Sequence, residues 1–285
     1  MDAQRIVVGY DGSIGARDAV GWAAAEAERT GSRLHIVYAY LLAWPGAEYD
    51  GPVAQMTAEA QERGDRLVAE IVEQVRRRGT GIQVVGTALH AAPAPALIDL
   101  GDTGAGLIVV GNRGGGGITN LLVGSVSQQV ATHAHAPVVV VRGRHDAVDG
   151  PVVAGADGSA SSHAALGIAF ETARLRGTGV LAVRAYVPPA VTALPAGVIE
   201  ASERRALDAS VTGWKEKYPS VKVETLLVNG RTAEVLVGAS RTAQLIVVGS
   251  RGHGGFTGLL LGSVGQQLMH HAECPVLIVH APKPS

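Results

Sequence analysis

The stretch LIVVGNRGGGGITNLLVGSVSQQ at residues 107–129 returns almost unchanged as LIVVGSRGHGGFTGLLLGSVGQQ at residues 245–267. Seventeen of the 23 positions are identical, and the two copies lie 138 residues apart. Self-similarity at a fixed distance indicates a structural unit that has been duplicated. In both copies an apolar run leads into several glycines and then into a Gly-Ser pair, so the repeat also indicates where to look for a site.

The similarity between the two copies extends outward from this stretch in both directions. IVVGYDGS at residues 6–13 matches VVAGADGS at residues 152–159, at an offset of 146. APVVVVR at residues 136–142 matches CPVLIVH at residues 274–280, again at an offset of 138. Because the offset falls by eight between start and end, the first copy carries about eight additional residues in its middle.

The length of the chain agrees with this duplication. At roughly 150 residues per domain, 285 residues correspond to about two domains. We predict one domain over residues 1–145 and another over residues 150–285, with the polar segment RHDAVDGP at 144–151 as the linker. The insertion of the first copy falls at residues 41–55, where a loop could close over a ligand or contact another chain.

Composition excludes several classes of protein. Hydrophobic residues make up 47% of the chain and charged residues 17%, which excludes a disordered polymer. The net charge is −1, whereas a nucleic-acid partner requires a basic surface. We expect no membrane partner, because no apolar run is long enough to span a bilayer. Cys274 is the only cysteine and the N-terminus shows no leader pattern, so we expect a reduced, cytoplasmic protein.

Strand-like and helix-like segments alternate within each copy. Continuous Val- and Ile-rich runs are typical of parallel strands buried on both faces, and helices between them give right-handed crossovers. The predicted fold class is therefore α/β, with an open, doubly wound, five-stranded parallel sheet in each repeat. The predicted helices cover residues 16–30, 56–78, 94–102 and 125–133 in the first copy, and 160–176, 196–217, 231–242 and 263–271 in the second.

A glycine-rich loop follows the fourth predicted strand of each copy with the spacing G-x2-G-x9-G-S. Glycines allow a backbone to approach a ligand closely, and a helix N-terminus with a Ser N-cap attracts anions. The pattern predicts a phosphate-binding loop. A flexible surface loop is the alternative, which two copies with identical spacing disfavour. The motif residues are Gly111, Gly114, Gly124 and Ser125 in the first copy, and Gly249, Gly252, Gly262 and Ser263 in the second.

Asp11 and Asp157 end the first predicted strand of their copies, in GYDGS and GADGS. An aspartate next to glycine can simply form a turn. In an open parallel sheet, however, ligands bind beyond the carboxyl ends of the strands where the strand order reverses. If the order is 3-2-1-4-5, each aspartate faces the glycine-rich loop of its own copy. A carboxylate there suits a ribose hydroxyl or a base amine better than a phosphate.

The GYDGS start, the glycine-rich loop and the final PVVVV strand resemble the universal stress protein family, and the resemblance covers the chain twice, as a tandem universal stress protein. It implies the adenine-nucleotide α-hydrolase-like fold with sheet order 3-2-1-4-5. It also implies ATP, with Mg²⁺ bridging the phosphates, at one site per repeat. The implied nucleotide-binding residues are Gly9, Asp11, Ala39, Gly111, Arg113, Gly114, Gly124, Ser125 and Val126 in the first repeat, and Gly155, Asp157, Ala185, Gly249, Arg251, Gly252, Gly262, Ser263 and Val264 in the second.

The expected function is that of an ATP-binding regulatory stress-response protein, without catalytic residues and without a metal site of its own. A slow ATPase on the same fold and an interaction scaffold with empty sites are the alternatives. His253 replaces Gly115 in the second loop and could touch a phosphate or simply be exposed. The last strands, 137–141 and 275–279, are expected to pair within the chain as an internal pseudo-dimer, and whole chains could form a homodimer.

Overall fold

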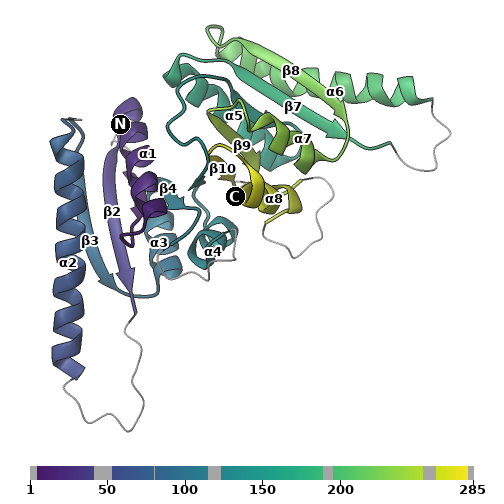
Figure 1. The fold of residues 1–285 in the computed structure, drawn as a ribbon. Coiled ribbons are helices and arrows are strands. Elements are labelled where there is room, and N and C mark those ends of the chain that lie inside the picture. The colour runs from purple at the N-terminus through teal and green to yellow at the C-terminus, as the bar shows by residue number, and fades with distance from the viewer. Residues whose placement is uncertain are drawn as a thin grey trace. The chain divides into compact units, whose positions relative to one another are not determined.

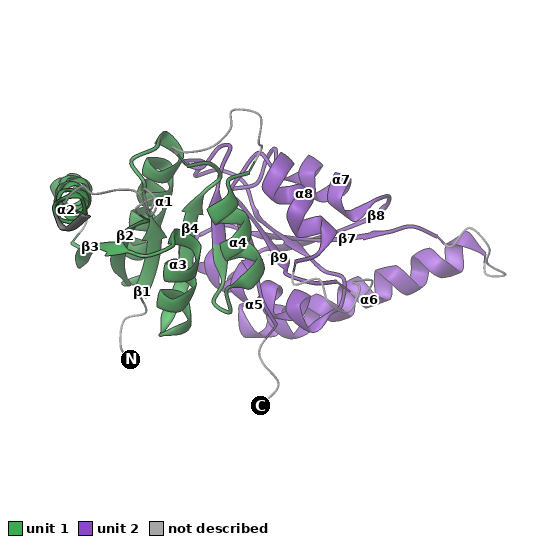
Figure 2. Cartoon of the chain, turned by 90° about the horizontal axis from the view of Figure 1, so that it is seen from below, with its two compact units in different colours: residues 1–138 green, residues 139–285 purple. Residues whose placement is uncertain are grey.

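The computed structural model describes residues 5–41, 53–79, 81–114, 123–188, 195–252 and 261–281. The chain divides into two compact units, residues 1–138 and 139–285, which are coloured separately in Figure 2. Each unit alternates strands and helices (Figure 1). Among the described residues, no helix is both long enough and apolar enough to cross a membrane.

Unit 1 contains four parallel strands in the order β3-β2-β1-β4, so that β1 lies between β2 and β4. The long helix α2 packs on β3, as Figure 1 shows. This order agrees with the predicted arrangement of the first four strands. The strands are β1 (Arg5–Gly9), β2 (Arg33–Tyr40), β3 (Val84–His90) and β4 (Ala105–Gly111), and the helices are α1 (Ile14–Thr30), α2 (Val53–Arg77), α3 (Pro93–Asp102) and α4 (Ser125–His133).

Unit 2 repeats the plan, with the strand order β5-β10-β9-β6-β7-β8. The five strands of the second repeat thus lie in the order 3-2-1-4-5 when read from β8, which confirms the prediction. The strands are β5 (Val138–Val141), β6 (Val152–Gly155), β7 (Val180–Tyr186), β8 (Val223–Asn229), β9 (Leu245–Gly249) and β10 (Val276–Val279), and the helices are α5 (Ala160–Arg176), α6 (Ala196–Lys217), α7 (Thr232–Ala239) and α8 (Ser263–His271).

The first helix of each repeat begins and ends on the residues that its sequence supplies for the purpose. Ser13 is the N-cap of α1, and its Oγ accepts a hydrogen bond from the backbone N–H of Ala16 at 3.2 Å. Ser159 caps α5 in the same way. Gly31 and Gly177 end the two helices in the left-handed conformation, with φ of 66° and 63°.

The central strands form the core of each unit. Val7 in β1, Ile108 in β4 and Ile246 in β9 are fully buried, because helices cover both faces of a parallel sheet. Apolar residues of α1 and α5 pack onto these strands, among them Ala23 and Phe170, whose side chains are also fully buried. The packed sheets fix the carboxyl ends of the strands, where the candidate site lies.

The segment that follows β5 belongs to unit 2 and is hydrogen-bonded to the rest of it at Arg144 and Gly150. The Arg144 backbone N–H donates to the Glu273 carbonyl at 2.8 Å, and its guanidinium donates to the Ala243 carbonyl at 3.1 Å. The Gly150 carbonyl accepts from Gln244 Nε2 at 2.8 Å. The boundary between the compact units falls after residue 138, so that most of β5 and the whole predicted linker lie in unit 2.

Candidate functional site

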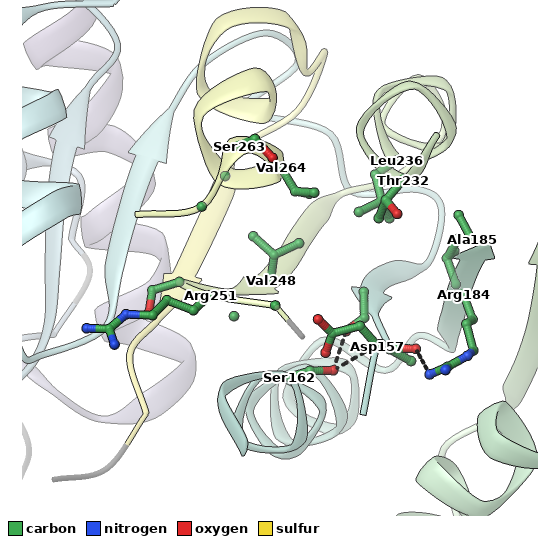
Figure 3. A pocket seen from close by; sticks show the side chains of 18 residues that line it. Asp157, Ser162, Arg184, Ala185, Thr232, Leu236, Val248, Arg251, Ser263 and Val264 are labelled. Carbon is green, nitrogen blue, oxygen red and sulfur yellow. Dashed lines mark hydrogen bonds between the residues drawn. The ribbon is translucent and has the colours of Figure 1, made fainter. Parts of the chain in front are cut away.

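Each unit contains a cavity at the carboxyl ends of its strands. The cavity of unit 1 measures about 260 Å³ and that of unit 2 about 360 Å³, which Figure 3 shows from close by. Pockets for small molecules and cofactors typically measure about 300–1,000 Å³, so the unit 2 cavity lies at the lower end of that range and the unit 1 cavity slightly below it. The two cavities occupy equivalent places in the repeated fold.

The structure brings every predicted site residue of a repeat to one cavity. This happens because β1 neighbours β4, and β6 neighbours β9, so the Asp turn and the glycine-rich loop emerge side by side. The predicted residues that line the unit 1 cavity are Gly9, Asp11, Ala39, Gly111, Arg113, Gly114, Gly124, Ser125 and Val126. Those that line the unit 2 cavity are Gly155, Asp157, Ala185, Gly249, Arg251, Gly252, Gly262, Ser263 and Val264.

The end of the glycine-rich loop corrects one expectation about helix capping. The N-caps of α4 and α8 are Gly124 and Gly262, and neither helix has a side-chain cap hydrogen bond. Ser125 and Ser263, which were predicted as N-caps, are instead the first helical residues. Because no side chain caps them, the first-turn N–H groups of both helices face the cavity with the positive end of the helix dipole.

The two ends of the loop are tied together by a backbone hydrogen bond in each unit. The N–H of Gly124 donates to the Asn112 carbonyl at 2.8 Å, and the N–H of Gly262 donates to the Ser250 carbonyl at 2.7 Å. The bond brings the start of the α4 or α8 helix against the end of the fourth strand of its repeat. Both loops therefore have the same framework around the helix N-terminus.

The aspartates form the turns, and each also has a second carboxylate oxygen beside the glycine-rich loop. Asp11 Oδ1 accepts from the Ser13 N–H at 3.0 Å, and Asp157 Oδ1 accepts from the Ser159 N–H at 2.9 Å, as turn-forming aspartates do. The second carboxylate oxygen faces the loop, since a methyl group added to Gly252 would lie 2.5 Å from Asp157 Oδ2. Each aspartate thus shapes its turn and also presents an oxygen to the cavity.

The first glycine of the motif has a packing role in addition to its place in the cavity. A methyl group added to Gly111 would lie 2.5 Å from the Gly15 carbonyl oxygen, so the strand end approaches the first turn of α1 directly. A methyl group on Gly249 would lie 2.8 Å from the backbone carbon of Ser161 in α5. Glycine is needed at these positions because backbone meets backbone there.

Several residues of the cavity walls were not predicted. In unit 1, Tyr10 and Leu97 line the cavity, together with Ser127, whose Oγ donates to the Gly111 carbonyl at 2.5 Å. In unit 2, Thr232 and Arg184 line it. Tyr10 and Ser127 lie within the quoted stretches. Leu97 in α3, Thr232 in α7 and Arg184 in β7 lie outside them, and the sheet order rather than a spacing in the sequence brings these three to the cavity.

Arg184 and Arg251 have different surroundings in unit 2. Arg184 Nε forms an ion pair with Glu203 Oε2 at 2.5 Å, and its Nη1 donates to the Ala156 carbonyl at 3.2 Å. The guanidinium of Arg251, which was predicted to line the phosphates, points away from Asp157 in Figure 3. The contribution of Arg251 to the cavity is therefore chiefly its backbone.

The remaining histidine, cysteine and aromatic side chains with a chemistry of their own have structural surroundings or lie outside the described parts. His135 Nδ1 lies 2.8 Å from Asp102 Oδ2. Cys274 is fully buried, and burial raises the pKa of its thiol to about 12. In the described part of the chain, no three His, Cys, Asp or Glu side chains gather as metal ligands would. His253 and the Trp44 and Tyr49 side chains of the insertion fall outside the described residues.

Comparison with known proteins places this geometry in a family. The model of the universal stress protein family matches residues 3–142 and again 150–280. Universal stress protein Rv2005c of Mycobacterium tuberculosis is 34% identical over 288 residues, which covers 96% of each chain.

Two solved structures are also similar. A universal stress protein from Archaeoglobus fulgidus has the same fold, with a TM-score of 0.73, 17% identity, and coverage of 98% of this chain and 97% of that one. A universal stress protein in complex with cAMP is 30% identical and covers 50% of this chain and 98% of that one, with a TM-score of 0.36. By the family match and the full-length relative, this chain belongs to the universal stress protein family and contains two copies of the family domain in tandem.

Proposed function

We propose that each repeat binds ATP and that the protein acts as a regulatory nucleotide-binding module. One observation carries the proposal: in both units, a helix N-terminus without a side-chain cap and an aspartate line the same cavity. A helix N-terminus favours an anion, and a carboxylate oxygen favours a hydroxyl or amine donor. A nucleotide carries both kinds of group within one molecule.

The chemistry of the cavity walls fits the parts of such a ligand. The first-turn N–H groups at Ser125 and Ser263 would hold the phosphates, and Mg²⁺ would bridge phosphate oxygens and add positive charge there. The second carboxylate oxygens of Asp11 and Asp157 would accept from the ribose hydroxyls or the base amine. Backbone N–H groups bind phosphate without a basic surface, which agrees with the net charge of −1.

Binding with regulation is favoured over efficient hydrolysis. Phosphoryl transfer needs groups that orient the nucleophile and neutralise the charge that develops. Within the described residues that line the unit 2 cavity, the carboxylate is Asp157 and the cations are Arg184 and Arg251. One oxygen of Asp157 is bound in its turn and the other is assigned to the ribose or base of the ligand, while Arg184 is paired with Glu203. A slow ATPase and a scaffold with empty sites remain the alternatives that experiment must separate from this proposal.

The proposal is tested by adding a negative charge where the phosphates would lie. Ser125 and Ser263 are exposed first residues of their helices, where an aspartate is favourable for the helix dipole. Isothermal titration with ATP is expected to give two sites in the native protein, one in either single Ser→Asp variant, and none in the double variant. The Ser125→Asn and Ser263→Asn variants are matched controls, because asparagine has the shape of aspartate without its charge.

Two outcomes of the titration contradict the proposal. Unchanged ATP affinity in the double aspartate variant would show that the helix N-termini do not hold the phosphates. The slow ATPase would be favoured if the native protein hydrolyses ATP well above background and the double aspartate variant does not.

Homodimer formation by whole chains and a cytoplasmic location stay predictions of the sequence.

A further inference from the structure

We propose that the two nucleotide sites fill in order, with the second repeat binding first, because its glycine-rich loop is anchored before a ligand arrives. This inference rests on the proposed function and adds a difference between the two sites. It comes from serine hydroxyls in the first turn of α5 that have no counterpart in α1. The positions concerned are not among the eighteen predicted site residues.

The anchor of the second loop is Ser161. Its Oγ donates a hydrogen bond to the Arg251 carbonyl at 2.6 Å, and Ser159 Oγ donates to the same carbonyl at 3.2 Å. Ser161 is buried, with 4% of its surface exposed, so water competes little for this bond. The Arg251 carbonyl immediately precedes Gly252, the glycine that lies against Asp157. The bond therefore fixes the part of the loop that borders the cavity.

The first repeat lacks this anchor. Gly15 occupies the position equivalent to Ser161 and has no hydroxyl group. The corresponding contact in unit 1 comes from Ser13, whose Oγ lies 3.5 Å from the Arg113 carbonyl, at the outer limit for a hydrogen bond. The Arg113 carbonyl of unit 1 thus has one long contact with a serine hydroxyl, whereas the Arg251 carbonyl of unit 2 accepts two serine hydrogen bonds of ordinary length.

The aspartate side of the cavity differs in the same direction. Ser162 Oγ accepts from the Asp157 N–H at 3.1 Å and donates to the Gly155 carbonyl at 2.9 Å. Figure 3 shows Ser162 directly beside Asp157 at the cavity wall. The equivalent residue in unit 1 is Ala16, which can make neither bond. In unit 2 both the aspartate turn and the loop are therefore held by the first turn of α5.

A site that is already ordered gives up less conformational freedom when its ligand binds. One intramolecular hydrogen bond changes an equilibrium by roughly 2- to 10-fold. The first site has one bond of its own, from Ser127 Oγ to the Gly111 carbonyl at 2.5 Å, where the second repeat has Gly265. The bonds of Ser159, Ser161 and Ser162 in the second site outnumber it. We therefore expect ATP to bind the second repeat about tenfold more tightly than the first, so that low nucleotide concentrations fill one site only.

Single-site proteins allow the two affinities to be measured separately. The Ser125→Asp variant leaves the second site, and the Ser263→Asp variant leaves the first, so titration of each with ATP gives one Kd. The expected result is a Kd about tenfold lower in Ser125→Asp. Adding Ser161→Ala to that variant should raise its Kd by about 3- to 10-fold, because alanine keeps the Cβ but cannot donate to Arg251.

A matched control and a second readout separate anchoring from general damage. Ser210 in α6 also donates from Oγ to a backbone carbonyl, that of Leu207, at 2.6 Å. Ser210→Ala should leave the Kd unchanged. In the nucleotide-free protein, hydrogen exchange at the Arg251–Gly252 amides should be slower than at Arg113–Gly114, and Ser161→Ala should speed the former while Ser210→Ala does not.

The outcomes distinguish this inference from the function on which it rests. If neither single-site variant binds ATP, the proposed function fails, and the order of filling fails with it. If both bind ATP with equal Kd, the function stands and the order of filling is wrong. The order is also wrong if Ser161→Ala speeds exchange at the loop without changing the Kd.

Discussion

Gly252 packs directly against the carboxylate of Asp157, so closely that a methyl group on Gly252 would lie 2.5 Å from Asp157 Oδ2. The same relationship joins Gly114 to Asp11 in the first repeat. Each pair connects the turn after the first strand of its repeat with the loop after the fourth. The aspartate of each repeat therefore explains the second glycine of the motif, and the two repeated motifs, DGS and the glycine-rich loop, meet at this contact in each unit.

This contact predicts the effect of Gly252→Ala. The methyl group would meet the end of a short side chain, so Asp157 can move and the fold should persist, with the free energy of unfolding lowered by less than about 1 kcal/mol. The displaced carboxylate should no longer meet its ligand group, and ATP binding at the second site should weaken about tenfold. Titration of the Ser125→Asp protein with and without Gly252→Ala measures the change.

Gly213→Ala is the matched control for that substitution. Gly213 lies inside α6, and nothing lies within 4 Å of an added methyl group. Alanine there should raise the free energy of unfolding by roughly 0.5–1 kcal/mol, because glycine is a poor helix former. The ATP affinity should stay the same. An equal loss of affinity in both variants would mean that the Asp157 contact is irrelevant to binding.

The first and third glycines of the motif should respond differently to alanine. Gly111→Ala places a methyl group against the backbone of Gly15, which cannot move without shifting α1. We expect a loss of about 1–3 kcal/mol in stability. At Gly124 the nearest atoms to an added methyl group are 3.6 Å away, and the loss should stay below about 1 kcal/mol. Urea unfolding of both variants tests this, and equal losses would contradict it.

Cys274 should be unreactive in the folded protein. Burial raises the pKa of its thiol to about 12, so almost no thiolate is present near pH 8. Iodoacetamide should label it only after unfolding in guanidinium chloride, which mass spectrometry can follow. Because the folded pKa exceeds the unfolded value, this group stabilises the fold fully below about pH 8.5, and the contribution is lost as pH rises toward 12. Rapid labelling of the native protein would contradict this account.

The buried His35 should make unit 1 less stable in mild acid. Burial, and to a lesser degree Arg5, lowers the pKa of His35, whose Nε2 lies 2.9 Å from Thr87 Oγ1. The unfolded chain therefore takes up a proton more readily, and stability present above about pH 6.5 is lost as pH falls below it. His35→Gln, which stays neutral, should flatten this part of the dependence. The measurement is the urea midpoint of the native protein and of His35→Gln between about pH 5 and pH 7.5. The prediction is wrong if the midpoints of the two proteins depend on pH equally.

The sequence predicted helices and strand order well where its local signals are strong. The helix over residues 125–133 and those over 160–176 and 196–217 have the predicted bounds, because glycines, prolines and serines mark their ends. The glycine of each DGS turn has a positive φ, 81° at Gly12 and 88° at Gly158, which explains why both copies keep it.

What the sequence could not predict depends on contacts between distant segments. Serine is a favoured N-cap residue, which made Ser125 the expected cap. Gly124 takes that place instead, because its N–H is bound to the Asn112 carbonyl. Arg184 reaches the cavity from the end of β7, and its partner Glu203 comes from α6. The anchoring role of Ser161 depends on a carbonyl of the glycine-rich loop, and no spacing of residue types along the chain encodes that pair.

The hydrogen bonds of Arg144 and Gly150 have a consequence for how the protein can be divided. A gene fragment that begins at residue 150, where the second family match begins, would keep Gly150 but not Arg144. That fragment would lose the strand beside β10 and the bonds of Arg144 to the Ala243 and Glu273 carbonyls. The segment that is repeated in the sequence thus differs from the segment that packs together, because the tail of the first repeat lies in the same compact unit as the second repeat.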